Sequence, residues 1–349
     1  MLAIGASAGL LERIRATGFV ITRREELPNL GLSVVRLRAP LRVTAPEALT
    51  RLRREFPAGE FALNHVYDLE AGPCEAAHCY ASQLINWPLP AASSCGAGLR
   101  VGMVDTAVDT GHPALRGHQV VVRHFADNGR PSDPAHGTAV AALLVGRAGA
   151  GFPGLLPGAE LVAADAFKTD ARGRDRTTAY LLARALDWLL DWQVAAVNMS
   201  MAGPANPLLE KAVRAYTGRD QPLVAAAGNG GPDAPPAYPA AYPGVLAVTA
   251  VDQRLRLYRY ANRGDYVALA APGVAIWTPA PDGGGEYRNG TSFAAPFVTA
   301  VVADLRARES LPLAGLNRRL RDGARDLGAP GRDALYGWGL VRSPVRCGG

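Results

Sequence analysis

Three side chains of the types used in acyl transfer stand at the ends of apolar segments of this chain. Asp105 closes the apolar run Val101–Asp105, His136 opens the small apolar segment 136–143, and Ser292 follows a glycine turn. A serine hydroxyl becomes a nucleophile when a histidine takes its proton, and a carboxylate can hold that histidine in the required tautomer. Nucleophilic catalysis is therefore the chemistry that these residue types suggest.

Each of these residues also has an ordinary structural explanation when it is taken alone. Asp105 could cap the helix after its strand, and His136 and Ser292 could each cap the helix that they open. A fourth residue, Asn229, follows an apolar run and Gly228, and it could be a turn residue or could aim its amide into a cleft. The argument for function rests on the combination.

The elements that must position these residues alternate apolar runs with helical patterns. We expect strands at 99–104, 160–166, 195–199, 223–227 and 245–251, and helices at about 138–145, 178–192, 207–216 and 292–308. Near-continuous apolar strands between helices are typical of an α/β fold, here a mostly parallel sheet with helices on both faces. Such sheets place their sites at the carboxyl ends of strands. Segments 266–271 and 276–288 suggest loops and hairpins instead.

A small α+β module precedes this pattern. It contains predicted strands at 18–23, 32–37 and 61–67, and a helix that begins at Thr44 with a capping box completed by Glu47. We therefore divide the chain into a module at 1–70, a linker and domain start at 71–98, and a large domain at 99–349.

Composition narrows the function classes further. The 349 residues are 48% hydrophobic with a net charge of +6, which is enough apolar material for a sizeable core. Only two of the 37 basic residues are lysines, and the arginines form no stripe interleaved with aromatic residues, so we expect no nucleic-acid partner. No run of about 18 apolar residues occurs, so we expect no membrane span.

The four cysteines bear on metals and on the compartment. Cys74, Cys79, Cys95 and Cys347 form no CxxC pair, and no histidine lies at zinc-ligand spacing from them, so we expect no metal site. Their even number suggests two disulfides and a secreted or periplasmic protein, with free cytosolic thiols as the alternative. The start of the sequence shows no clear signal peptide, so either there is none or this start lies downstream of one.

In chain order, Asp105, His136, Asn229 and Ser292 on a parallel sheet make the sequence resemble the subtilisin-like serine peptidases, the S8 family. The resemblance spans roughly Tyr80 to Val341. It implies that Ser292 is the nucleophile, His136 the general base, Asp105 its orienting acid and Asn229 an oxyanion-hole donor beside the Ser292 backbone N–H. The motifs that carry it are Val104–Asp109, His136–Thr138, Ala227–Asn229 and Gly290–Pro296.

The resemblance also implies a substrate cleft to which an extended peptide adds by main-chain hydrogen bonds. Its expected lining residues are Ser200, Met201, Ala202 and Gly228, with Ala202 standing where the family commonly has glycine. Structural calcium is frequent in the family, but Asp127, Asn128 and Asp282 are isolated candidates, and no cofactor is required.

The N-terminal module is similar to the inhibitory propeptide of the family. Its tail, Asn64–Leu69, is expected to lie in the cleft, with self-cleavage between about Tyr67 and Cys79. Cys74 and Cys79 could then tie a short loop, and Cys95 and Cys347 could join the two ends of the large domain. A permanent accessory domain is the competing interpretation of the module.

The resulting hypothesis is a monomeric serine endopeptidase that acts on polypeptides and carries its own N-terminal segment as an intramolecular inhibitor. The alternative is a non-catalytic peptide-binding module on the same fold.

Overall fold

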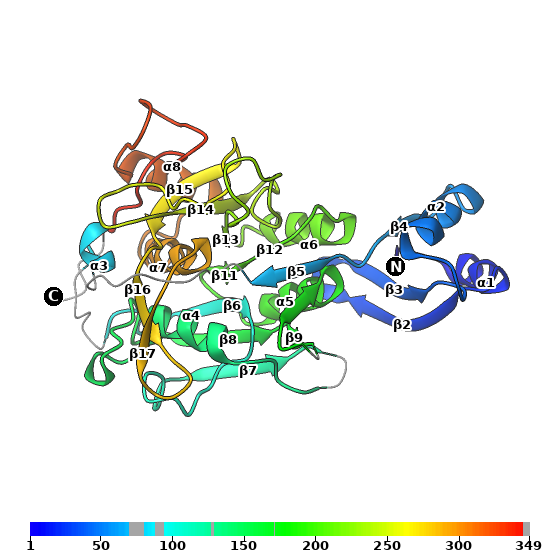
Figure 1. The fold of residues 1–349 in the computed structure, drawn as a ribbon, viewed down its shortest axis with the longest axis horizontal. Helices are drawn as coiled ribbons and strands as arrows, with labels where there is room; N and C mark the ends of the chain where they lie inside the picture. Colours follow the sequence, from blue (N-terminus) through cyan, green and yellow to red (C-terminus); the bar gives the residue numbers. More distant parts are fainter. Residues whose placement is uncertain (70–79, 88–93, 127–128, 171, 345–349) are drawn as a thin grey trace.

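The largest element of the computed structural model is a seven-stranded sheet in which every neighbouring pair is parallel (Figure 1). The structure describes residues 1–69, 80–87, 94–126, 129–170 and 172–344. The sheet order is β15-β14-β13-β11-β6-β8-β7. The strands are β6 (Arg100–Asp105), β7 (Val120–His124), β8 (Glu160–Asp165), β11 (Val197–Met199), β13 (Leu223–Ala226), β14 (Val245–Val251) and β15 (Val267–Pro272). The predicted α/β class is confirmed.

Helices cover both faces of this sheet. The core on one face contains Met103 with α4 (Ala135–Val145) and α7 (Thr291–Glu309), and the core on the other contains Val104 with α5 (Ala179–Asp191) and α6 (Pro207–Thr217). Alternate strand residues point to opposite faces, so each strand feeds both cores. Helix α7 is buried all round from Thr291 to Leu305, which makes it the central helix of the fold.

The N-terminal module forms a separate antiparallel sheet in the order β2-β3-β1-β4. Its helices α1 and α2 pack on one face against Ala3 and Val35, while Leu2, Ile4 and Val34 join the core that contains α5 and α6. The module is thus a two-faced layer docked on the large domain. Its elements are β1 (Leu2–Ile4), α1 (Ala8–Ala16), β2 (Val20–Leu27), η1 (Pro28–Leu30), β3 (Leu32–Arg38), α2 (Ala45–Glu55) and β4 (Glu60–Ala62).

The prediction of a single strand over residues 61–67 is wrong. This part of the chain forms two strands, β4 and β5 (Val66–Leu69), which belong to different sheets. The chain between them is held by polar contacts instead of a ladder: the Tyr180 N–H donates to Asn64 Oδ1 at 3.1 Å, and the Ala179 N–H donates to the His65 carbonyl at 3.1 Å. These contacts to the start of α5 turn the chain out of the module.

Strand β5 lies in the middle of a small sheet with the order β12-β5-β10-β9. It pairs antiparallel with β10 (Asp175–Thr178) on one side and with β12 (Met201–Ala202) on the other. Strand β9 (Lys168–Thr169) completes this sheet. A segment of the N-terminal part is therefore inserted between two strands of the large domain.

Segment 266–271, predicted as a loop, is the edge strand β15. Its alanine-rich sequence has weak β-propensity, and a register irregularity at Ala247/Val248 lets it pair with β14. The hairpin predicted within 276–288 is confirmed as β16 (Ile276–Pro279) and β17 (Gly285–Arg288). Elements that the sequence patterns missed include α3 (Ala81–Leu84), η2 (Ala148–Ala150) and α8 (Leu313–Gly323). Each helix within the described ranges is too short or too polar to cross a bilayer.

Candidate active site

Asp105 and His136 form a buried hydrogen-bonded pair. Asp105 ends β6 in the interior of the sheet, and its Oδ1 lies 2.7 Å from His136 Nδ1 and accepts the Thr106 N–H at 2.7 Å. Neither side chain is more than 5% exposed. Because a carboxylate only accepts hydrogen bonds, His136 donates through Nδ1, and the lone pair of the neutral ring lies on Nε2. Within the described part of the chain, this buried Nε2 has no hydrogen-bond partner.

Glycine at position 137 permits this pairing. The Gly137 N–H donates to Thr106 Oγ1 at 2.8 Å, and a Cβ here would overlap the carbonyl oxygens of Thr106 and Ala107. Any side chain would therefore push the first turn of α4 away from the end of β6. His136 lies inside the first turn of α4, so the alternative explanation of this residue as a helix cap is wrong.

Ser292 is the second residue of α7, and Gly290 is the N-cap. The alternative explanation of Ser292 as a helix cap is therefore wrong, and Pro296 lies inside the helix. Proline has no N–H, so the carbonyl of Ser292, four residues earlier, receives no bond from the helix. Ser200 supplies it, because its Oγ donates to the Ser292 carbonyl at 2.8 Å.

Behind Ser200 the hydrogen bonds continue into the core. Asn198 Nδ2 donates to Ser200 Oγ at 2.8 Å, and Thr299 Oγ1 donates to Asn198 Oδ1 at 3.1 Å. All three side chains are buried. The start of α7 is therefore anchored to β11 by a polar chain that sequence analysis did not anticipate.

Asn229 lies beside the same helix start. Its Oδ1 accepts both the backbone N–H and the hydroxyl of Thr291, each at 3.1 Å. These bonds orient the amide, so that Nδ2 is the end turned away from Thr291. Gly228 adopts a φ of +104°, a region that favours glycine, and its N–H donates to Thr291 Oγ1 at 3.2 Å.

The predicted catalytic residues are thus brought close together from β6, α4, α7 and the loop after β13. Asp105 bonds His136, the His136 ring lies 5.2 Å from the ring of Phe293, the residue after Ser292, and Asn229 bonds the residue before it. The arrangement is suited to proton transfer from a hydroxyl beside aligned hydrogen-bond donors.

Two of the four predicted substrate-binding residues, Met201 and Ala202, lie on the strand that pairs with β5. Met201 pairs with Leu69 and Ala202 pairs with Asp68, while Ser200 lies at the head of α7. Strand β10, which pairs with the other edge of β5, was not predicted, because its sequence Asp-Arg-Thr-Thr lacks the apolar alternation of a strand. The only features of its sequence that indicate a strand are the two threonines and the position directly before a helix.

A second group of missed residues supports the segments that carry Asp105 and His136. Asp165 is buried, and its carboxylate accepts Ser132 N–H at 3.0 Å, Ser132 Oγ at 2.7 Å and His124 Nδ1 at 2.7 Å. Ser132 Oγ in turn accepts the Ala107 N–H at 2.9 Å. The loop before His136 is thereby tied to the end of β6.

A further carboxylate, Asp175 of β10, faces the same loop. Thr169 Oγ1 donates to Asp175 Oδ1 at 2.6 Å, and the Asp133 N–H donates to Thr169 Oγ1 at 2.9 Å. Burial raises the pKa of Asp175, and the nearby negative charge of Asp133 raises it further. Strand β10 and the loop before His136 are therefore connected through Thr169.

The remaining candidates concern metals and disulfides. Among the residues described, no three histidine, cysteine, aspartate or glutamate side chains gather as a metal site, and Asp282 accepts the Gly284 N–H within a turn. Asp127 and Asn128 lie outside the described residues. So do Cys74, Cys79 and Cys347, while Cys95 is buried, and both disulfide pairings stay predictions.

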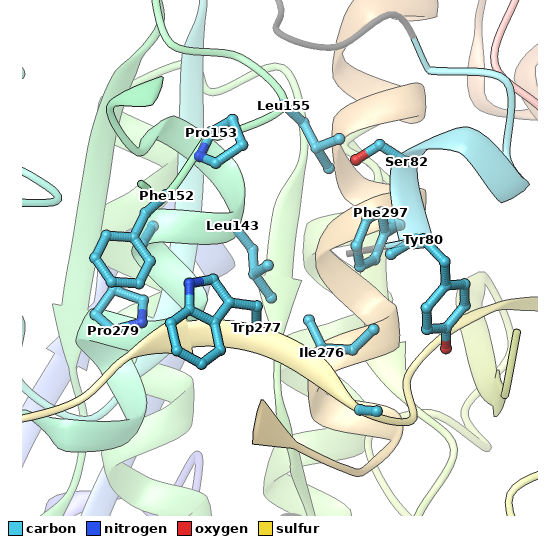
Figure 2. A pocket seen from close by; sticks show the side chains of 13 residues that line it. Tyr80, Ser82, Leu143, Phe152, Pro153, Leu155, Ile276, Trp277, Pro279 and Phe297 are labelled. Atoms are coloured by element: carbon cyan, nitrogen blue, oxygen red, sulfur yellow. The ribbon is translucent and has the colours of Figure 1, made fainter. Parts of the chain in front are cut away.

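An apolar pocket of about 60 Å³ lies apart from these residues (Figure 2). Leu143 of α4, Phe297 of α7 and Trp277 of β16 contribute to its wall, and the ring of Phe152 lies parallel to that of Trp277 at 6.2 Å. It contains none of the four predicted catalytic residues.

Comparison with known proteins identifies the class. The Subtilase family profile (Peptidase_S8) matches residues 96–339. Subtilisin BL of Lederbergia lenta is 32% identical over 256 residues, which cover 71% of this chain and 90% of that protein. The chain therefore belongs to the subtilase family.

Other relatives are longer than this chain. A subtilisin-like protease of Coccidioides posadasii (strain C735) is 30% identical over 249 residues, 69% of this chain and 60% of that protein. Minor extracellular protease Epr of Bacillus subtilis (strain 168) is 33% identical over 216 residues, which cover 60% of this chain but only 32% of Epr.

Two solved structures share the fold. The crystal structure of fervidolysin, a keratinolytic enzyme from Fervidobacterium pennivorans, superposes with a TM-score of 0.81 at 22% identity, covering 98% of this chain and 59% of fervidolysin. A serine-to-alanine mutant of the PatA protease domain gives a TM-score of 0.63 at 31% identity, covering 71% of this chain and 94% of that domain. The likeness to fervidolysin extends over the N-terminal module as well.

Proposed function

We propose that this chain is a serine endopeptidase that forms an acyl-enzyme on Ser292. The observation that carries the proposal is the buried bond between His136 Nδ1 and Asp105 Oδ1 at 2.7 Å, beside the start of α7. It leaves His136 Nε2 as the neutral base of the ring, on the side away from Asp105. That is the tautomer that general-base catalysis requires.

In this mechanism His136 Nε2 takes the proton of Ser292 Oγ as the oxygen attacks the substrate carbonyl carbon. Asp105 stabilises the imidazolium that forms, and Asn229 Nδ2 and the Ser292 N–H donate to the oxyanion. The imidazolium then gives its proton to the leaving amine as the peptide bond breaks. Water, deprotonated by His136, hydrolyses the ester and restores the hydroxyl.

We further propose that residues 1–70 act as an intramolecular inhibitor. Support comes from β5, which occupies the strand position between β10 and β12 that an extended substrate would fill. Ser200, Met201, Ala202 and Gly228 would then be substrate-binding residues. Cleavage that releases this segment is expected between about Tyr67 and Cys79.

The whole protein is proposed to be a secreted or periplasmic monomer that acts on polypeptides. One relative is named as an extracellular protease, which favours export. The two disulfide pairings, Cys74–Cys79 and Cys95–Cys347, belong to the same proposal and are tested by peptide mapping without reduction. Calcium, if it binds, would have a structural role.

A non-catalytic peptide-binding module is the second candidate, because the insertion of β5 between two strands requires no chemistry. Casein hydrolysis by the wild type and by Ser292→Ala separates the two, with both N-termini sequenced. A peptidase loses hydrolysis and processing in the variant. A wild type that keeps Met1, cleaves nothing and does not react with a fluorophosphonate at Ser292 would leave only the binding function.

A further inference from the structure

A cavity of about 320 Å³ lies at the boundary between the N-terminal module and the large domain. Arg36 and Arg38 of β3 line it from the module, and Lys168 of β9 and Thr178, the N-cap of α5, line it from the large domain. Figure 1 shows β9 and α5 on the side of the large domain that faces β2 and β3. None of the described residues that line the cavity is acidic. Positive charge is therefore contributed to one cavity by both units.

The pleat of β3 turns the two arginines toward the large domain. Val34, Arg36 and Arg38 are alternate residues of this strand, so their side chains share one face of the module's sheet. Val34 is fully buried in the core that contains α5 and α6. Along the same face, burial falls from Val34 through the half-buried Arg36 to the exposed Arg38. The docked face of the module therefore ends in two cations at the cavity.

The nearest carboxylate of the module is already engaged. The Cζ of Arg36 lies 5.2 Å from the centroid of the Tyr180 ring, and the hydroxyl of Tyr180 donates to Glu25. The same carboxylate accepts the Nε–H of Arg184 and, at 3.0 Å, the Nε–H of Arg23. Because Glu25 serves two arginines and a tyrosine, it is not a counter-ion for Arg38 or for the cation on the other wall.

That second cation, Lys168, belongs to β9. Neither Lys168 nor the side chain of Arg38 forms a hydrogen bond or an ion pair with any residue that the structure describes. Lys168 lies directly opposite Arg176 on the ladder of β9 and β10, and like charges in that position are destabilising. Asp170, the acidic residue on this turn, pairs with Arg174 at 3.0 Å and lies 3.8 Å from Arg176. The carboxylates described near Lys168 and Arg38 are thus bound to other arginines.

We propose that this cavity binds a small doubly charged oxyanion of the phosphate class, which bridges Arg38 of the module and Lys168 of the large domain. Two cations on opposing units repel each other when the units dock, and an anion between them replaces the repulsion with charge-assisted hydrogen bonds. The cavity has both cationic walls only when the module is docked. The anion therefore strengthens docking by binding the docked form alone. This inference does not depend on the peptidase function.

The test measures hydrogen exchange of the β5 amides in the Ser292→Ala chain, because β5 leaves its sheet when the module separates. Sodium phosphate at about 10 mM is compared with sodium chloride at the same pH and ionic strength. We expect phosphate to slow the exchange by about tenfold, the factor that a ligand with a dissociation constant of about 1 mM gives at this concentration. An equal slowing by chloride would show charge screening alone and would overturn the proposal.

Arg38→Gln and Lys168→Gln should each reduce this slowing to about twofold or less, because each removes one of the two bridged cations. Both side chains are exposed, so neither change opens a core. Arg38→Lys should keep most of the effect, since it keeps the charge and loses only the fork. Full slowing by phosphate in Arg38→Gln and Lys168→Gln would overturn the proposed site.

Lys211→Gln is the matched control, because Lys168 and Lys211 are the two lysines of the chain. Lys211 also stands at the boundary, but it pairs with Glu60 of the module at 2.5 Å. The control changes the net charge by the same amount and should keep the tenfold ratio between the two salts. Because each ratio compares two salts on one protein, a change in basal docking cancels. An equal fall of the ratio in Lys211→Gln would show an effect of overall charge and would overturn the local role of Lys168.

Titration calorimetry with inorganic phosphate measures binding to the same chains directly. Arg38→Gln and Lys168→Gln should weaken the affinity by about tenfold, and Lys211→Gln should leave it unchanged. Phosphate that binds all four chains equally, or that binds without slowing exchange of the β5 amides, would overturn the link between this cavity and docking.

Discussion

The large domain and the N-terminal module are held together by different means. In the large domain, both faces of one parallel sheet are covered by helices over continuous apolar cores. The module has a small core of its own between its sheet and α1 and α2, and its other sheet face is buried only because α5 and α6 cover it. The module therefore depends on the large domain for half of its burial, whereas the seven-stranded sheet does not depend on the module.

Polar contacts at the boundary reinforce this difference. Glu25 of β2 accepts hydrogen bonds from Tyr180 and Arg184 of α5, and Lys211 of α6 pairs with Glu60 at 2.5 Å. Such contacts fix the orientation of the module on α5 and α6. Exposed ion pairs contribute little to the free energy of docking. Under the proposed function, the module is the unit expected to separate, and the large domain is the unit expected to persist.

The largest expected effect comes from Ser292→Ala, which should lower kcat by about 10⁶-fold because it removes the nucleophile. The chain should also remain uncleaved, so that β5 stays in place. Mass spectrometry of the purified protein and casein hydrolysis measure both effects. Processing at the wild-type rate in the variant would mean that another protease separates the two units.

Asn229→Ala should lower kcat by about 10²- to 10³-fold, because it removes one donor to the oxyanion. KM should change little, since the interaction forms in the transition state. Thr291→Ala is the control, because it removes the hydroxyl that bonds Asn229 Oδ1 and keeps the proposed donor. A rise in KM with kcat unchanged would assign Asn229 to substrate binding.

Leu30→Ala should weaken docking of the module by about 2–4 kcal/mol, because this buried side chain packs in the core shared with α5 and α6. Hydrogen exchange of the β5 amides in the Ser292→Ala background measures the change. Leu41→Ala, at a position that is 96% exposed, is the matched control. Equal protection in both variants would contradict the dependence of the module on this face.

The smallest effect concerns pH. Burial at the boundary lowers the pKa of His65 below its usual 6.5, so the proton binds the released segment more readily than the docked one. Docking should be strongest above pH 6.5 and should weaken as the pH falls toward the docked pKa. Hydrogen exchange of the β5 amides between pH 7.5 and 5 tests this prediction. The variant His65→Gln should remove the part of the pH dependence of docking that His65 causes.

Much of the fold could be read from local patterns. Strand β14 occupies the predicted residues 245–251, and α5 begins after Thr178, which caps it by accepting the Leu181 N–H. The capping box of Thr44 and Glu47 is present at the start of α2. These succeed because apolar runs and caps depend on neighbours in the chain.

The failures follow from the same principle. Strand β15 has weak local propensity and exists because β14 offers a ladder, and β10 exists because β5 and β9 flank it. Ser292 resembled a cap, yet the helix begins one residue earlier because Thr291 bonds Asn229. In each case a partner distant in the chain decided the local structure.

By itself the sequence determined the fold class and the order of the aspartate, histidine, asparagine and serine motifs, because periodicity, turns and motif order are contained in short stretches of chain. Only the tertiary structure decided that β5 lies between β10 and β12 and that Arg288 lies beside Phe293. It also decided that the Ser200 hydroxyl donates to the Ser292 carbonyl, which receives no helical hydrogen bond because residue 296 is proline. The strand and Ser200 contacts join segments about 90 residues or more apart, and the Arg288 contact depends on how the hairpin packs on α7. No local pattern encodes which distant surface a segment will meet.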